Sequence, residues 1–142
     1  MATTQALRMD GRGAEQAASI SPSRQAFLIL RFAFTVAPIV AGLDKFFNLL
    51  VDWERYVPDV VARLLGGNVH GLMLGVGVIE IAAGIGVAVR PRLFAYVVAA
   101  WLFAIIANLL LIPGYYDVAL RDLGLALGAL ALARLSVDHD GH

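Results

Sequence analysis

The sequence predicts an all-α membrane protein: a four-transmembrane-helix bundle with an extracytoplasmic amphipathic segment between helices 1 and 2. Apolar residues make up 60% of the 142 residues and charged residues 15%, whereas soluble domains contain roughly 45–50% apolar and 25% charged residues. The apolar residues form continuous runs, which favours membrane helices over the alternating strands of a membrane barrel. A soluble helical bundle would need polar outer faces, and these runs have none.

Four segments are long enough to cross a bilayer, whose core of about 30 Å needs roughly 20 helical residues. They cover about residues 25–47, 69–89, 93–112 and 116–135, of which the third is uncharged and the fourth is the least apolar. Helix-breaking residues lie between them, in Gly66-Gly67-Asn68, Arg90-Pro91-Arg92 and Pro113-Gly114. The chain is therefore divided into a disordered N-terminal tail (1–24), a transmembrane domain (25–135) and a polar C-terminal tail (136–142).

The distribution of basic residues predicts which way the bundle faces, because cytoplasmic flanks are enriched in Lys and Arg. One side of the predicted bundle carries Arg8, Arg12, Arg24, Arg90, Arg92 and Arg134, and the other carries Lys45, Arg55, Arg63 and Arg121. The bias is modest, and the short loop with Arg90 and Arg92 is the strongest evidence for it. Both termini are therefore expected in the cytoplasm.

The segment between the first two spans has a helical repeat of apolar residues. These are Leu49, Leu50, Trp53, Val57, Val60, Val61 and Leu64. Opposite charges four residues apart, in Arg55, Asp59 and Arg63, support a helix with one polar face. We expect an amphipathic segment on the outer membrane surface, bent near Pro58. It either covers the mouth of the bundle or provides a docking or gating surface for a partner.

A glutamate in the second span is the most informative polar residue. An ionised residue near the bilayer centre costs about 2.5–3.5 kcal/mol, so such residues face the bundle interior and are paired or functional. Glu80 lies between long apolar runs, and we expect it to be protonated or paired with a cation from another helix. It either handles protons or anchors a headgroup, or it forms an interhelical salt bridge. Arg31 in the first span either turns toward Glu80 or extends to the interface.

A second set of polar residues is expected at one depth near the outer ends of the spans. Its members are Lys45, Asn108, Arg121 and Asp122. A pair of Lys45 with Asp122 would join the first and last helices. Close helix packing is predicted from Gly71-x-x-x-Gly75 and Gly124-x-x-x-Gly128, together with Gly77, Gly84 and Gly86.

Several function classes lack support in the sequence. The chain has no cysteine, and its scattered histidines do not form a metal-ligand pattern. No phosphate-binding loop, hydrolase nucleophile motif, zinc-protease motif or dinucleotide fingerprint is present. The net charge is zero, which gives no indication of nucleic-acid binding. We therefore assign no catalytic or metal-ligating residue, and expect no catalytic activity from the chain alone.

With the spans in place, the chain resembles the DoxX family of small bacterial and archaeal membrane proteins over roughly residues 28–135. The resemblance rests on Arg31, on Gly42 and Lys45 in GLDKFF, on Glu80 followed by Gly84, on Arg90-Pro91-Arg92, and on Asp122. The wide first loop, with Trp53 and Tyr56, departs from the shortest members. The resemblance implies four helices in a prokaryotic plasma membrane and association with respiratory or redox complexes, since founding members look like subunits of quinone-reducing thiosulfate oxidation.

Three functions follow as hypotheses. The first is a non-catalytic subunit of a quinone-linked redox complex, in which Glu80, Arg31 and the outer polar residues bind a quinone headgroup or pass protons. The second is a structural or scaffold subunit, and the third is a small ion or proton transporter, which would need a hydrated path from Glu80 to both faces. The expected partners are the lipid bilayer and other membrane proteins or a second copy of the chain.

Overall fold

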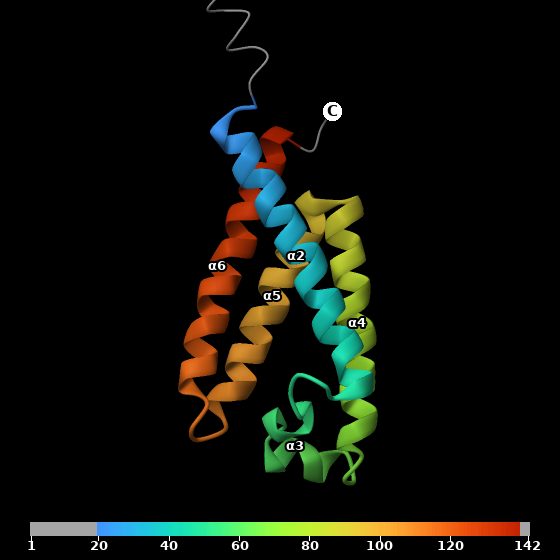
Figure 1. Cartoon of the computed structure of the whole chain (residues 1–142). Helices are drawn as coiled ribbons and strands as arrows, with labels where there is room; N and C mark the ends of the chain where they lie inside the picture. The colour runs from blue at the N-terminus through green and yellow to red at the C-terminus, as the bar shows by residue number, and fades with distance from the viewer. Residues whose placement is uncertain (1–19, 140–142) are drawn as a thin grey trace, which may run out of the picture.

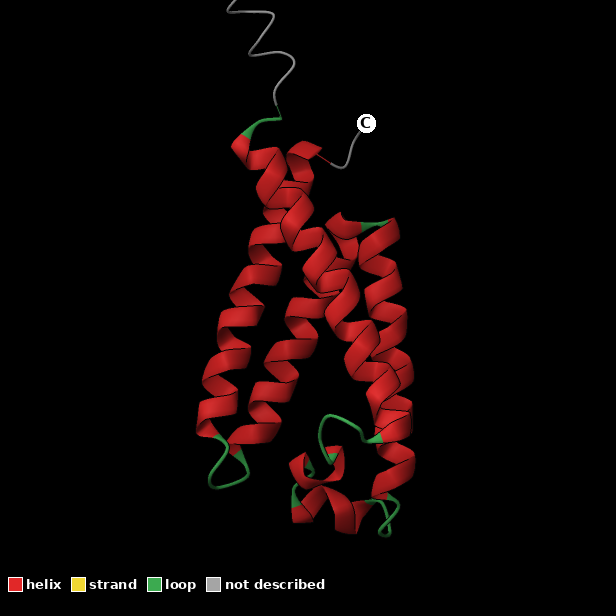
Figure 2. Ribbon diagram, viewed as in Figure 1, coloured by secondary structure: helices red, strands yellow, loops and turns green. Residues whose placement is uncertain are grey.

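The computed structural model describes residues 20–139, and this part of the chain is helical with short connections and no strand (Figure 2). Its helices are α2 (Pro22–Phe47), the 3-10 helix η1 (Trp53–Tyr56), α3 (Asp59–Leu64), α4 (Val69–Val89), α5 (Pro91–Leu110) and α6 (Tyr116–His139). The four long helices correspond to the four predicted segments. The first 19 residues and residues 140–142, which include most of the predicted tails, lie outside the described residues.

The structure extends α2 and α6 beyond their predicted bounds, both at the end of the molecule where the described chain begins and ends. α2 begins at Pro22, because Ser21 accepts a hydrogen bond from the Arg24 N–H and proline is favoured in the first helical turn. α6 continues to His139 instead of ending at residue 135, so residues 136–139 are helical and do not belong to a tail. Its last turn is held by Arg24, which donates a hydrogen bond to the His139 carbonyl oxygen at 3.1 Å.

The long helices form two antiparallel pairs, α2 with α4 and α5 with α6 (Figure 1). The pairs meet near the two ends of the described chain, which lie at the same end of the molecule, and they diverge toward the opposite end, where η1 and α3 lie. The largest buried cluster is at the end where the pairs meet. It contains Phe27, Phe34, Ala83, Val87, Ala95, Val98, Ala99, Ala129, Leu132 and Ala133.

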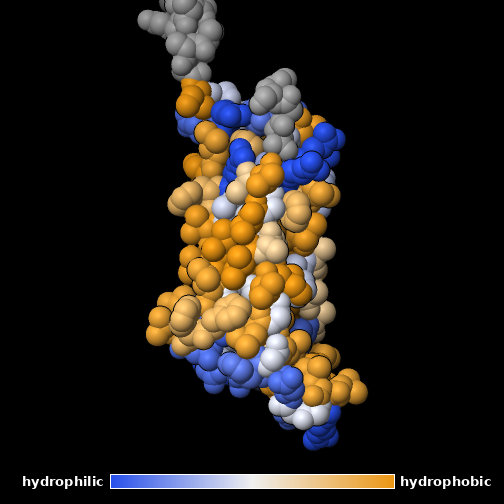
Figure 3. Space-filling view, turned by 90° about the vertical axis from the view of Figure 1, so that its right-hand side faces the viewer, coloured by the Kyte–Doolittle hydropathy of each residue, from blue (hydrophilic) through white to orange (hydrophobic). Residues whose placement is uncertain are grey.

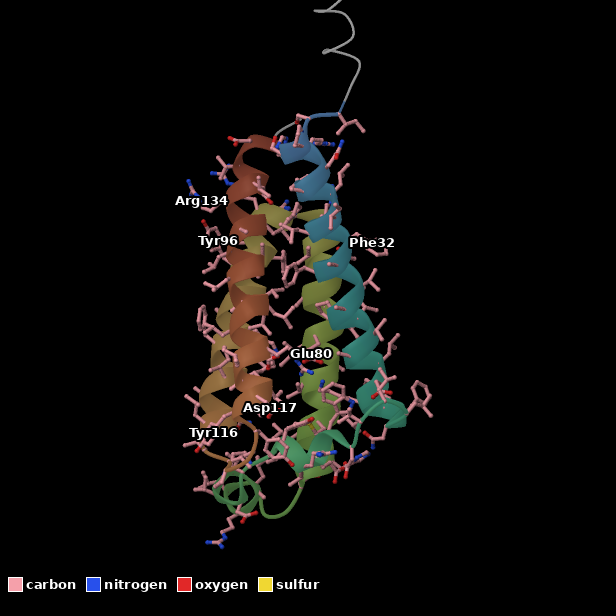
Figure 4. All side chains as sticks on the ribbon, turned by 60° about the vertical axis from the view of Figure 1, so that its left-hand side comes forward. Phe32, Glu80, Tyr96, Tyr116, Asp117 and Arg134 are labelled. Carbon is pink, nitrogen blue, oxygen red and sulfur yellow. The ribbon has the colours of Figure 1, made fainter. Side chains whose placement is uncertain are left out.

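Three of the described helices, α2, α4 and α5, are long and apolar enough to cross a membrane, which indicates a membrane protein. On the face shown in Figure 3, an apolar belt crosses the middle of the molecule and hydrophilic residues gather toward both ends. Large apolar side chains point outward from this belt, as Phe32 does in Figure 4. Helices are therefore confirmed at the four predicted segments, and three of them are candidate membrane spans by length and composition.

Glycines bring α2 and α4 into backbone contact. A methyl group added at Gly42 would lie 2.5 Å from the Gly77 carbonyl oxygen, and one added at Gly77 would lie 2.7 Å from the Gly42 carbonyl oxygen. Further along the pair, a methyl group at Gly84 would lie 2.7 Å from the Thr35 carbonyl oxygen. The predicted close packing is thus confirmed for Gly77 and Gly84, whereas a methyl group at Gly75 would meet no atom within 4 Å.

Candidate functional site

A buried ion pair joins α2 to α4. Lys45 Nζ lies 2.6 Å from Glu80 Oε2, and the two side chains are 4% and 11% exposed. Lys45 comes from the last turn of α2 and Glu80 from the middle of α4, and Figure 4 shows Glu80 pointing into the space between the helices. The expectation that Glu80 pairs with a cation from another helix is confirmed. Removal from water makes such a pair depend strongly on both partners being present.

A tryptophan from the segment after α2 lies against this pair. The Trp53 ring centroid is 3.7 Å from Lys45 Nζ, within the range of a cation–π interaction. The Trp53 indole also donates a hydrogen bond to Asp44 Oδ2 at 2.7 Å. The lysine head group is thus held between a carboxylate and an indole ring.

Asp44 fixes the turn that brings Trp53 to this position. α2 ends at Phe47, and Asn48 adopts the left-handed conformation with φ of 51° that often ends a helix. The following N–H groups of Leu49 and Leu50 donate to Asp44 Oδ1 at 2.9 and 3.0 Å. Asp44 therefore accepts hydrogen bonds from two backbone groups and the Trp53 indole.

The segment from η1 onward is also attached to α4, α5 and the α5–α6 turn. Asn108 Nδ2 donates to the Tyr56 carbonyl oxygen at 2.8 Å, and the Tyr56 and Tyr115 rings meet edge to face with centroids 5.0 Å apart. Arg55 Nε donates to the Tyr115 hydroxyl at 3.4 Å, and this hydrogen bond raises the pKa of Arg55 above its ordinary value. The segment thus connects both helix pairs at the end where they diverge, and its two alternative roles, cover of the bundle mouth or docking or gating surface, stay predictions.

The predicted pair of Lys45 with Asp122 is wrong, because the Lys45 ammonium is bound to Glu80. Asp122 is buried on α6 and has Arg121 as its ion-pair partner, with Arg121 Nε 3.6 Å from Asp122 Oδ1. Asn108 donates to the Tyr56 backbone and belongs to the anchoring of η1. The residues of the single polar cluster inferred from depth therefore form three separate contacts, Lys45 with Glu80, Asn108 with Tyr56 and Arg121 with Asp122, because depth does not determine helix rotation.

The alternative in which Arg31 pairs with Glu80 is also wrong. The Arg31 guanidinium donates a hydrogen bond to the Ala88 carbonyl oxygen near the end of α4 and lies 5.9 Å from the Phe27 ring centroid. The contacts of Gly42 with Gly77 set a register in which Glu80 is level with Ile39. Arg31 is two turns from that level, about 12 Å along the helix at a rise of 1.5 Å per residue.

Trp53 and Asp44 are the site residues that sequence reasoning missed. The available signal was an acidic residue one turn before the helix end, because the backbone N–H groups that follow the helix have no helical partner and need acceptors. No group of three or more His, Cys, Asp or Glu side chains that could hold a metal ion occurs among residues 20–139. Comparison of the chain with protein-family models, curated proteins and solved structures found no match. The chemistry of the site must therefore be argued from its own residues.

The Asp44→Asn variant should loosen the turn after α2. An amide is uncharged and has one acceptor oxygen, whereas both Asp44 oxygens accept hydrogen bonds. Loss of hydrogen bonds to a charged group costs about 1.5–3 kcal/mol each. Hydrogen–deuterium exchange in detergent micelles should therefore show the Leu49 and Leu50 amides exchanging roughly ten-fold faster or more.

Asp59→Asn is the matched control for this exchange experiment. Asp59 is exposed at the start of α3 and forms no ion pair with a described residue. Its replacement should leave the Leu49 and Leu50 exchange rates unchanged. Unchanged rates in Asp44→Asn as well would show that Asp44 does not hold the turn.

Proposed function

We propose that the chain is a DoxX-like integral membrane protein that crosses a prokaryotic plasma membrane four times and serves as a non-catalytic subunit of a quinone-linked redox complex. The observation that carries this proposal is the buried Lys45–Glu80 pair beneath Trp53. Such an ion pair inside an apolar belt is costly to bury and is therefore a candidate for function.

The length and packing of α6 support its role as the fourth span. Its 24 residues extend about 36 Å, which exceeds the bilayer core of about 30 Å, and α6 packs along α5. The stretch from residue 123 to residue 133 is uncharged. The charges on either side are accommodated because Asp122 is buried beside Arg121 and Arg134 lies toward the opposite end of the helix (Figure 4).

The proposed orientation rests chiefly on the two arginines of the short connection between α4 and α5, at the end of the molecule where the described chain begins and ends, because the opposite end carries as many cations (Lys45, Arg55, Arg63 and Arg121). Arg24, Arg90, Arg92 and Arg134 belong to the former end of the helices. Tyrosines, which favour membrane interfaces, lie near both ends of the bundle, with Tyr96 near Arg134 and Tyr116 near the opposite end (Figure 4). The proposal therefore places both termini in the cytoplasm and η1 and α3 on the outer side.

The donor set of the pair fits a quinone headgroup. A bound quinone would accept and release electrons. The Lys45 ammonium is a hydrogen-bond donor suited to a carbonyl oxygen of the headgroup, and the Glu80 carboxylate is an acceptor suited to a hydroxyl group of the headgroup. The Trp53 indole offers a flat apolar surface to the headgroup ring. In this proposal Trp53 covers the pair and gives way to the headgroup.

The Glu80→Gln variant tests this function. The full chain is purified from native membranes in mild detergent, bound quinone is extracted and quantified, and co-purifying chains are identified by mass spectrometry. The native chain should carry near-stoichiometric quinone and redox subunits, and Glu80→Gln should reduce bound quinone roughly ten-fold or more, because a hydrogen bond to a charged group is worth about 1.5–3 kcal/mol.

Glu54→Gln is the control, because Glu54 is a glutamate of η1 that pairs with the exposed His70 at 3.0 Å and makes no ion pair with Lys45. It should retain quinone and partners at the native level. A native chain that carries only phospholipid and no redox subunit would contradict the proposal.

A structural role is the second candidate, and one observation favours it. Lys45 and Glu80 neutralise each other, and Lys45 lies beside the backbone contact of Gly42 with Gly77 that joins α2 to α4. If the chain is a scaffold subunit, Glu80→Gln lowers the thermal stability of the purified protein and leaves its lipid and partner content unchanged. The two functions are therefore separated by measuring quinone content and stability on the same preparation.

A further inference from the structure

An open hollow of about 580 Å³ lies at the corner between α4 and α5, at the end of the bundle opposite η1 and α3. It is lined by Val89, Arg90, Arg92, Leu93 and Tyr96. Its volume falls within the range of small-ligand sites, roughly 300–1,000 Å³. None of these residues belongs to the Lys45–Glu80 site.

The upper part of the hollow is cationic and lacks compensating charge. Arg90 and Arg92 are exposed and form no ion pair with any residue in the range 20–139. Arg31 adds a third cation nearby, since its guanidinium is bonded to the Ala88 carbonyl oxygen next to Val89. Arginine side chains bind phosphate through paired hydrogen bonds. The hollow is thus suited to an anion with several acceptor oxygens.

The lower part of the hollow is apolar and continues toward the bilayer. Val89 and Leu93 are 68% and 55% exposed, and Tyr96 is also exposed and points away from the helices (Figure 4). Both helices that form the corner are long and apolar enough to cross a membrane. A ligand in this hollow would meet cations at the membrane surface and apolar side chains below it. A phospholipid has this arrangement, with an anionic head group above apolar chains, whereas a soluble anion has no apolar part.

We propose that this hollow binds the phosphate diester of an acidic phospholipid, with Arg90 and Arg92 as the phosphate ligands and with acyl chains along Leu93 and Tyr96. Basic hollows between membrane helices on the cytoplasmic side recognise acidic lipid head groups in this way. The site rests on the membrane insertion of α4 and α5, and it is independent of quinone binding.

The test uses the full chain, purified and stripped of lipid in detergent, with defined lipids added back. Native mass spectrometry and thermal unfolding are measured with dioleoylphosphatidylglycerol, with dioleoylphosphatidylcholine and with inorganic phosphate. The acidic lipid should bind near one molecule per chain and raise Tm, while the zwitterionic lipid and inorganic phosphate should not. In Arg90→Gln/Arg92→Gln the apparent affinity for the acidic lipid should fall roughly ten-fold or more.

Arg63→Gln is the matched control, because Arg63 is an exposed arginine that lines a different hollow, beside α3. It should bind the acidic lipid like the native chain. If the double variant unfolds in dioleoylphosphatidylcholine, the single Arg92→Gln variant provides the comparison. Equal lipid affinity in the variant and the native chain, or equal stabilisation by phosphatidylcholine or inorganic phosphate, overturns the assignment.

Discussion

Replacement of Lys45 by methionine is expected to lower the free energy of unfolding by about 3–5 kcal/mol, since it removes one partner of a buried ion pair. Methionine retains the unbranched stem of lysine, so the packing of α2 on α4 is largely kept. The Glu80 carboxylate, which is 11% exposed and bonded to Lys45 Nζ at 2.6 Å, is left without its cation. Tryptophan fluorescence during titration of mixed micelles with sodium dodecyl sulfate measures the change.

The double variant Lys45→Met/Glu80→Met separates the cost of an unpaired buried charge from the cost of lost packing. Buried ion pairs replaced by apolar residues of similar size are often neutral or stabilising, so the double variant should recover most of the stability lost in Lys45→Met. The double-mutant cycle should therefore give a large coupling between the two positions. A double variant as unstable as the single one would show that the ion pair is not the origin of the loss.

The Gly77→Ala variant is expected to destabilise the α2–α4 pair by about 1–3 kcal/mol, the usual cost of overpacking a tight contact. Its new methyl group would lie 2.7 Å from the Gly42 carbonyl oxygen, and backbone cannot move aside as a flexible side chain can. The same methyl group would lie 3.3 Å from Lys45 Cβ, so separation of the helices also disturbs the ion pair. The measurement is the same detergent titration.

Gly75→Ala is the control for this steric argument, on the same helix and two residues away. A methyl group there meets no atom within 4 Å, and alanine is favoured over glycine in a helix by about 1 kcal/mol. Gly75→Ala should therefore be neutral or slightly stabilising. Similar losses in both variants would indicate that the backbone contact of Gly42 with Gly77 does not determine the stability of the pair.

The helix bounds could be predicted from sequence because hydropathy and helix-breaking residues act locally. The range 69–89 predicted for the second span coincides with α4, whose start is capped by the Asn68 side chain. The extension of α6 to His139 could not be predicted in this way. It depends on the contact of its last carbonyl oxygen with Arg24, a residue more than a hundred positions earlier in the chain.

The partner of Glu80 could not be predicted, because hydropathy gives depth but gives neither helix rotation nor register. Depth alone allowed Arg31 as the partner of Glu80 and Asp122 as the partner of Lys45. The contact of Gly42 with Gly77 sets the register of α2 against α4. In this register, the Lys45 side chain at the end of α2 reaches Glu80 on α4.

The position of Trp53 depends on tertiary contacts and was not predictable from the helical repeat. The repeat assigned Trp53 to the apolar face of a surface segment. Its indole instead bonds to Asp44 and its ring lies against Lys45. An amphipathic pattern indicates that a side chain is covered, and it does not indicate what covers it.

The Lys45–Glu80 pair also has a consequence for biogenesis. Alone, α4 would carry the charge of Glu80 into lipid near the helix centre, at a cost of about 2.5–3.5 kcal/mol on insertion scales. Joined at 2.6 Å, the two charges cancel within a single hairpin. We therefore expect the hairpin of α2 and α4, rather than α4 alone, to be the unit that inserts into the membrane.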